Sequence, residues 1–173
     1  MRALVIAGVL CAALAGSAQA GDGPLAQMNF FQGCWRGQFS DAANVTDDRC
    51  FEPMQGGQYV RDTHAVHGGA GAYSGETIYY LDAQAHRLAF TYYASDGGMS
   101  RGFAESDSKG GLVFAPGTYV GADGSTLTMR ATWVADGRDR YIATAEVQEN
   151  GQWRPHLRIV YTRAHDLTAP VSR

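Results

Sequence analysis

Acidic and histidine side chains gather in one short segment, where Asp62, His64 and His67 lie close together along the chain. Such residues bind metal ions or move protons. The surrounding residues alternate as in a strand, so Asp62 and His64 share one face and His67 lies on the other. The closely spaced ligand pairs that are typical of zinc sites are missing from this segment. The pattern therefore favours a polar surface strand, and we predict no metal.

Nucleophilic catalysis has little support in the sequence. Ser74 falls one position too late for a Gly-x-Ser-x-Gly turn, and no helix is expected to follow it. The glycine-rich stretch 68–75 joins two expected strands, so it lacks the helix N-terminus of a phosphate cradle. An enzyme would then have to use a polar lumen, with Arg61, His64, Arg101 and Arg130 as the candidate participants. Inward-facing arginines would indicate an anionic ligand or a reaction, and outward-facing ones a plain scaffold.

Aromatic residues in the middle of the chain are the other functional signal. The candidates for ligand contact are Tyr80, Phe90, Tyr92, Phe103, Met129 and Trp133. They could fill a core, because small barrels pack their interior with side chains. They could equally line a cavity, because interior room grows with the number of strands. Both interpretations stay open at this point.

The elements that must position these residues are mostly strands. After Gly33, apolar and polar residues alternate with period two, and turn signals such as Asp123-Gly124 and Asn150-Gly151 recur about every ten residues. This predicts an all-β fold of about ten strands, an antiparallel meander that splits into a sandwich or, as we favour, closes into an up-and-down barrel without exposed edges. Before it, Pro24, Leu25, Met28 and Phe31 predict a short N-terminal helix of about two turns.

The N-terminus indicates export from the cytoplasm. Residues 1–20 resemble a signal peptide, with an uncharged apolar stretch and a cleavage site at Ala18-Gln19-Ala20. We therefore expect a barrel domain over 21–165, a C-terminal tail over 166–173, and no membrane span once the signal peptide is removed. The protein would then be periplasmic or secreted.

Charge and cysteine content narrow the partners. Loss of Arg2 leaves 13 basic against 17 acidic residues without a basic cluster, so nucleic acid is not an expected partner. Two cysteines remain, Cys34 and Cys50, and in an oxidising compartment they are expected to form a disulfide.

Two short motifs carry a family resemblance. Gly33-Cys34-Trp35 after a short helix, together with Tyr161-Thr162-Arg163 near the end, resembles the lipocalin-like (calycin) barrels. The stretch 30–37 is similar to bacterial secreted domains of unknown function and, distantly, to the nitrobindin-like haem barrels. The resemblance implies that Arg163 packs over Trp35 at one barrel end. If Trp35 points inward, alternation also places Cys34 outward, where it can meet Cys50.

Haem is the sharpest alternative ligand, because His156 lies where the resemblance would place a haem-binding histidine. The alternation of faces along the strand argues against haem binding at His156. Arg163 shares the apolar, inner face with Trp153, Leu157, Ile159 and Tyr161. His156 is seven positions from Arg163 and so faces outward unless a β-bulge intervenes.

The favoured interpretation is a binding protein for a small, largely apolar molecule held inside the barrel, without a cofactor. The alternatives are a haem-binding barrel, an enzyme that uses polar lumen residues, and a structural or interaction module with a filled core.

Overall fold

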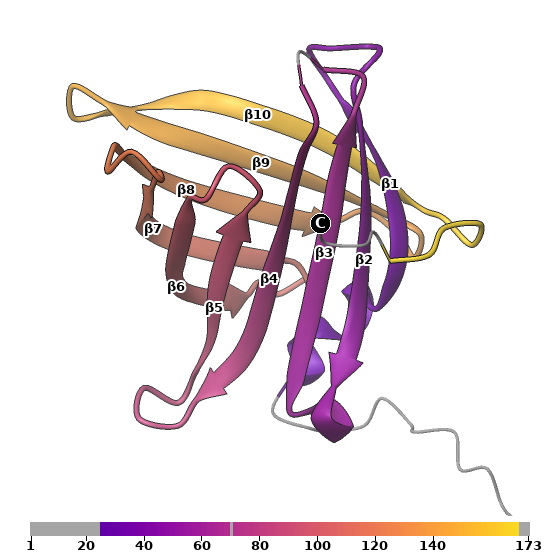
Figure 1. The fold of residues 1–173 in the computed structure, drawn as a ribbon. Helices are drawn as coiled ribbons and strands as arrows, with labels where there is room; N and C mark the ends of the chain where they lie inside the picture. Colours follow the sequence, from indigo (N-terminus) through magenta and orange to yellow (C-terminus); the bar gives the residue numbers. More distant parts are fainter. Residues whose placement is uncertain (1–24, 70, 170–173) are drawn as a thin grey trace, which may run out of the picture.

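The computed structural model describes residues 25–69 and 71–169, which form a closed barrel of ten antiparallel strands (Figure 1). The strands are β1 (Gly33–Phe39), β2 (Thr46–Met54), β3 (Tyr59–His67), β4 (Tyr73–Asp82), β5 (Arg87–Ala94), β6 (Met99–Ser106), β7 (Leu112–Val120), β8 (Thr126–Ala135), β9 (Arg140–Glu149) and β10 (Gln152–Arg163). Each strand pairs with its neighbours in sequence, and β1 pairs with β10 to close the barrel. The predicted all-β, up-and-down architecture is confirmed at this level.

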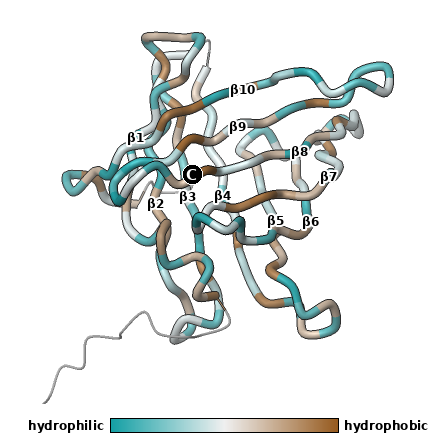
Figure 2. Tube along the Cα trace, turned by 180° about the vertical axis from the view of Figure 1, so that it is seen from behind, coloured by the Kyte–Doolittle hydropathy of each residue, from teal (hydrophilic) through white to brown (hydrophobic). Residues whose placement is uncertain are grey.

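The strands at the front and the back of the barrel cross each other at a steep angle. In Figure 1, β2, β3 and β4 run almost vertically in front, while β8, β9 and β10 run across behind them. Figure 2 shows the reverse side, where hydrophilic and hydrophobic residues alternate along the strands. Such alternation is expected when one face of each strand is buried and the other meets water.

The prediction of an N-terminal helix of about two turns is wrong about the type of helix. Among the described residues the segment before β1 is a 3-10 helix, η1 (Ala26–Phe31), and a second short one, η2 (Gln55–Gly57), lies between β2 and β3. No side chain caps η1, and Pro24 lies outside the described residues. So short a segment gains too little from its own hydrogen bonds to hold an α-helix. Burial of Leu25, Met28 and Phe31 against the barrel stabilises it instead.

Trp35, Arg163 and η1 close one end of the barrel, and we call this region the closed end. Trp35 is fully buried, and its indole N–H donates to the carbonyl of Phe31 at 2.7 Å. The Arg163 guanidinium lies 3.8 Å from the centre of the Trp35 ring, as expected. Arg163 also donates to the carbonyls of Gln32 and Phe30. These contacts satisfy the carbonyls that the end of η1 leaves without partners.

Close aromatic packing fills the space above the closed end. Tyr141 stacks on Tyr161 with ring centres 4.5 Å apart, and its edge meets Trp35 at 4.8 Å. Gly37 faces this cluster, where an added Cβ would lie 2.6 Å from both Ile159 and Tyr161. The glycine therefore lets the side chains of Ile159 and Tyr161 pack closely against the β1 backbone.

Cys34 and Cys50 form a disulfide on the outer face of the barrel, with Cα atoms 4.1 Å apart. The two residues lie directly opposite each other on β1 and β2, beside Trp35 and Phe51. The expected pairing is thus present in the structure, next to the closed end.

The terminal segments are only partly described. The expected signal peptide, residues 1–20, lies outside the described residues, as do residues 170–173 of the expected tail. Asp166 of that tail pairs with Arg36 of β1 at 3.4 Å. In the part of the chain that is described, no helix has the length and apolar character to span a membrane.

Candidate functional site

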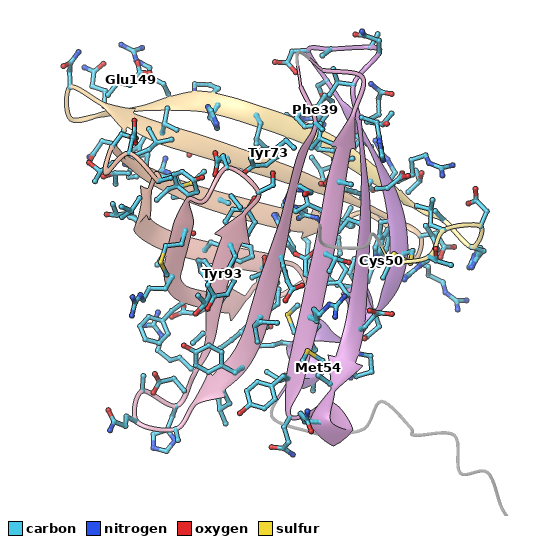
Figure 3. All side chains as sticks on the ribbon, viewed as in Figure 1. Phe39, Cys50, Met54, Tyr73, Tyr93 and Glu149 are labelled. Carbon is cyan, nitrogen blue, oxygen red and sulfur yellow. A yellow bond between two sulfur atoms is a disulfide. The ribbon has the colours of Figure 1, made fainter. Side chains whose placement is uncertain are left out.

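A cavity of about 610 Å³ lies inside the barrel. Its apolar lining includes Tyr79, Phe90, Phe114, Met129, Trp133 and Leu157. Its rim includes Phe39 at the end of β1 and Tyr73 at the start of β4, two residues labelled in Figure 3. The cavity therefore reaches the barrel end that carries the β1–β2 and β3–β4 loops, opposite the closed end.

Four of the six predicted ligand contacts line this cavity: Phe90, Tyr92, Met129 and Trp133. The other two, Tyr80 and Phe103, lie on the outer face, where Phe103 packs under Arg87 at 4.6 Å. Tyr79, the neighbour of Tyr80, takes the inward position, and it is 2% exposed. These aromatics were expected to act together, but the alternation of faces along each strand divides them between the cavity and the outer surface.

One wall of the cavity is polar, and of its residues only His64 was named in advance as a candidate for a polar lumen. Asp47 and Arg49 of β2 and Asp62 and His64 of β3 all line the cavity, and we call these four residues the polar wall. The expectation that Asp62 and His64 lie on a surface strand is wrong, because they are 1% and 6% exposed. A signal for it existed. If Phe51 points inward, alternation along the same strand also turns Arg49 and Asp47 inward.

A chain of hydrogen bonds runs from the polar wall to the cavity rim. His64 Nδ1 lies 2.9 Å from Asp47 Oδ1, and His64 Nε2 lies 3.1 Å from the hydroxyl of Tyr92. The Tyr92 hydroxyl lies 2.7 Å from that of Tyr73. The other Asp47 oxygen accepts a hydrogen bond from the Tyr161 hydroxyl. An ionised carboxylate can only accept, so Asp47 favours the histidine tautomer with the proton on Nδ1.

Gly75 makes room for this chain. It lies opposite His64 on the neighbouring strand β4. A Cβ at Gly75 would lie 2.7 Å from His64 Nε2 and would collide with the ring and hydroxyl of Tyr92. Any side chain at this position would therefore push the histidine and the tyrosine apart.

Arg49 carries the positive charge of the polar wall. Its Nε lies 3.5 Å from both Asp47 Oδ2 and Asp62 Oδ1, although neither contact has hydrogen-bond geometry. Its guanidinium lies over the rings of Trp133 and Tyr161 at 5.2 and 5.5 Å. Burial opposes its charge, but Asp62, Tyr161 and Asp47 hold the pKa of Arg49 well above the ordinary value. Arg49 is therefore a fixed cation beside the cavity.

The two buried carboxylates behave differently. Burial alone would raise the pKa of Asp47, but Arg49, His64 and Tyr161 together lower it below the ordinary value. Burial dominates at Asp62 and raises its pKa despite Arg49 and His64. Asp47 is thus the anchored anion, whereas Asp62 has fewer partners for its charge.

The three arginines that were named as participants lie outside the polar wall. Arg61 pairs with Glu76 at 3.5 Å and Arg130 pairs with Glu146 at 2.7 Å. Arg101 is exposed, and parts of Arg101 and Arg130 reach the cavity beside irregular pairing at β6–β7 and β7–β8. The arginine held inside the barrel is Arg49, which the sequence analysis did not name.

A β-bulge changes the faces in the first part of β10. The pairing of β10 with β9 shifts between Pro155 and Leu157. Trp153 therefore does not share the inner face with Leu157, as the sequence analysis assumed; it lies under Arg130 at 4.5 Å. His156 sits at the bulge, is exposed, and contributes to the cavity lining. The inserted residue, which was the stated exception to strand parity, therefore allows His156 to reach the cavity although it lies seven positions from Arg163.

Comparison with known proteins supports the fold alone. No family model and no curated protein matches the sequence. The crystal structure of Rv2717c from M. tuberculosis is similar, with a TM-score of 0.56 and 15% identity over 82% of this chain and 98% of that one. The likeness agrees with a barrel architecture and leaves the lipocalin-like and nitrobindin-like resemblances as resemblances. Within the described ranges, no three His, Cys, Asp or Glu side chains gather to hold a metal ion.

Proposed function

We propose that this protein binds a small, largely apolar molecule inside the barrel, in the periplasm or outside the cell. The observation that carries the proposal is the aromatic-lined cavity, which has a few polar groups on one wall. Binding sites for small molecules commonly combine an apolar lining with a few polar anchors. The barrel itself supplies such a site, and the proposal needs no cofactor.

A cavity-filling variant tests this function. Ala131 on β8 faces the cavity, whereas Val134 on the same strand is absent from the lining and is 37% exposed. We expect the apolar dye N-phenyl-1-naphthylamine to fluoresce with the wild-type protein and with Val134→Phe, and at least about tenfold more weakly with Ala131→Phe. Equal fluorescence with the two variants would place the dye elsewhere. Intact mass of the exported protein tests the compartment, since it should correspond to residues 21–173.

Haem binding is a second candidate, supported by the position of His156 at the cavity lining. An exposed imidazole there offers one axial ligand, and haem would supply the redox or gas-binding chemistry. Native mass spectrometry and absorbance of the purified protein separate the two candidates. A strong Soret band that is lost in His156→Ala would replace apolar binding with haem binding.

A further inference from the structure

The hydrogen-bond chain at the polar wall has a direction. Asp47 accepts from His64 Nδ1, so Nε2 of a neutral His64 has no proton and must accept from Tyr92. Tyr92 has given its one proton to His64, so it accepts from Tyr73. Tyr73 then presents oxygen lone pairs to the cavity that it lines, beside Tyr119, whose own hydroxyl donates to Asp96. The chain therefore ends in an acceptor that suits a ligand hydroxyl.

We propose that a phenol- or enol-type hydroxyl of the bound molecule gives up its proton through Tyr73 and Tyr92 to His64. The proposal rests on the binding function above and names the class of ligand. The ligand O–H bond breaks as its proton passes to Tyr73, the Tyr73 proton passes to Tyr92, and the Tyr92 proton passes to His64 Nε2. Three O–H bonds break, while two O–H bonds and one N–H bond form. The ligand is left as an oxyanion and His64 as an imidazolium.

The charges around His64 fit a second cation. Two carboxylates, Asp47 and Asp62, share the polar wall with one guanidinium, that of Arg49. Asp47 contacts the ring directly, with His64 Nδ1 2.9 Å from Asp47 Oδ1, so a proton taken up at Nε2 leaves the ring beside a carboxylate. Arg49 lies opposite His64 in the β2–β3 pairing and lines the same cavity, but its guanidinium lies over the rings of Trp133 and Tyr161 and beside the two carboxylates.

The tyrosines conduct the proton without keeping a charge. Burial raises the pKa of Tyr73 and, further, that of Tyr92, so neither hydroxyl rests as a phenolate. The proton must therefore continue to His64, the first base along the chain. A ligand with an acidic hydroxyl on an aromatic ring suits both this relay and the aromatic lining of the cavity.

The test uses 4-(4-nitrophenylazo)phenol, whose colour changes when its hydroxyl loses the proton, and its methyl ether, which has no proton to give. We expect the wild-type protein to shift the colour titration of the bound phenol to lower pH by at least about one unit, a tenfold effect. Tyr92→Phe breaks the chain and should abolish the shift, while the ether still binds within about twofold of wild type. Tyr73→Phe should act in the same way, and it serves if Tyr92→Phe fails to fold.

Tyr93→Phe is the matched control, because Tyr93 is the next residue on β5 and is 51% exposed on the outer face. It should leave the titration shift unchanged. Binding of both dyes without a shift in wild type, or a shift that persists in Tyr92→Phe, would overturn the proton relay and leave the binding function standing. Failure of both dyes to bind would overturn cavity binding of aromatic molecules of this size, and the relay with it.

Discussion

The closed end and the polar wall bury polar atoms in opposite ways. At the closed end, Trp35 and Arg163 donate to backbone carbonyls that would otherwise lack partners. At the polar wall, Asp47 and His64 bind each other and lead to a tyrosine on the cavity rim, while Arg49 Nε and Asp62 Oδ1 have no hydrogen-bond partner. A saturated network stabilises one structure, whereas an unsaturated one keeps bonding capacity for something else. The difference indicates that the closed end serves stability, and it is the polar wall to which the proposed proton relay belongs.

Removal of the Trp35 ring should give the largest effect on stability. Trp35→Ala should lower the free energy of unfolding by about 3–5 kcal/mol, because it leaves a cavity in packed aromatic surroundings. Urea unfolding monitored by circular dichroism measures the loss. Trp153→Ala is the control, since Trp153 lies outside under Arg130, and it should cost about 1 kcal/mol. Equal losses would contradict the assignment of stability to the closed end.

The disulfide beside the closed end should follow. Cys34 and Cys50 are separated by 16 residues, and replacing both with serine should cost about 3 kcal/mol on the chain-entropy account. Thermal unfolding with and without a reductant measures the contribution in the wild-type protein. The double variant should lose this dependence on reductant, and peptide mapping that finds both wild-type thiols free would refute the bond.

Arg163→Ala should cost about 2 kcal/mol, from its contact with the Trp35 ring and its bonds to two carbonyls. Tryptophan fluorescence should change as well, because the cation leaves the indole face. Arg158→Ala removes an exposed arginine of the same strand that bonds Ser40, and it should cost less than about 1 kcal/mol. An Arg163→Ala variant with the same free energy of unfolding as the wild-type protein would contradict the assignment of stability to the closed end.

A methyl group at Gly75 should affect chemistry more than stability. Gly75→Ala forces His64 and Tyr92 apart, at a cost of about 1–2 kcal/mol from overpacking. The azophenol should still bind but should lose its titration shift. Tyr93→Phe is again the control, because Tyr93 is 51% exposed on the outer face of β5 and is absent from the cavity lining. Retention of the shift in Gly75→Ala would show that the His64–Tyr92 contact is dispensable.

The smallest effect should appear as a slope of stability with pH. The lowered pKa of Asp47 means that its ionised form stabilises the fold above about pH 4, and that this stabilisation is lost as the pH falls through the folded pKa. The raised pKa of Asp62 has the opposite sign, so stability falls as the pH rises from about 4 through the folded pKa. Urea unfolding at several pH values measures both effects. Asp47→Asn should remove the stabilisation that the wild-type protein gains as the pH rises, and Asp62→Asn should remove the loss of stability that accompanies ionisation of Asp62. If both variants change the slope of unfolding free energy against pH in the same direction, the difference between the two carboxylates is contradicted.

The sequence by itself determined the alternation, the turns and therefore an all-β antiparallel meander, while the pairing of β1 with β10 decided that it closes into a barrel. It also indicated the pairing of Cys34 with Cys50 and, with the family resemblance, the packing of Arg163 on Trp35. These features follow from local rules, because a period of two and a turn signal act over a few residues. Parity counted from Trp35 or Phe51 remains valid as long as the strand is regular.

Only the tertiary structure decided where the chemistry lies. The bulge at His156 reversed the faces earlier in β10, and a single inserted residue leaves no periodic signal. Asp62 and His64 were expected on the surface, because the pattern of a single strand does not show which other strands cover its polar face. Closing the barrel placed Arg49, from the next strand, and Tyr92, from β5, against them. Buried polar residues are stable only when distant parts of the chain supply their partners, and folding alone brings those parts together.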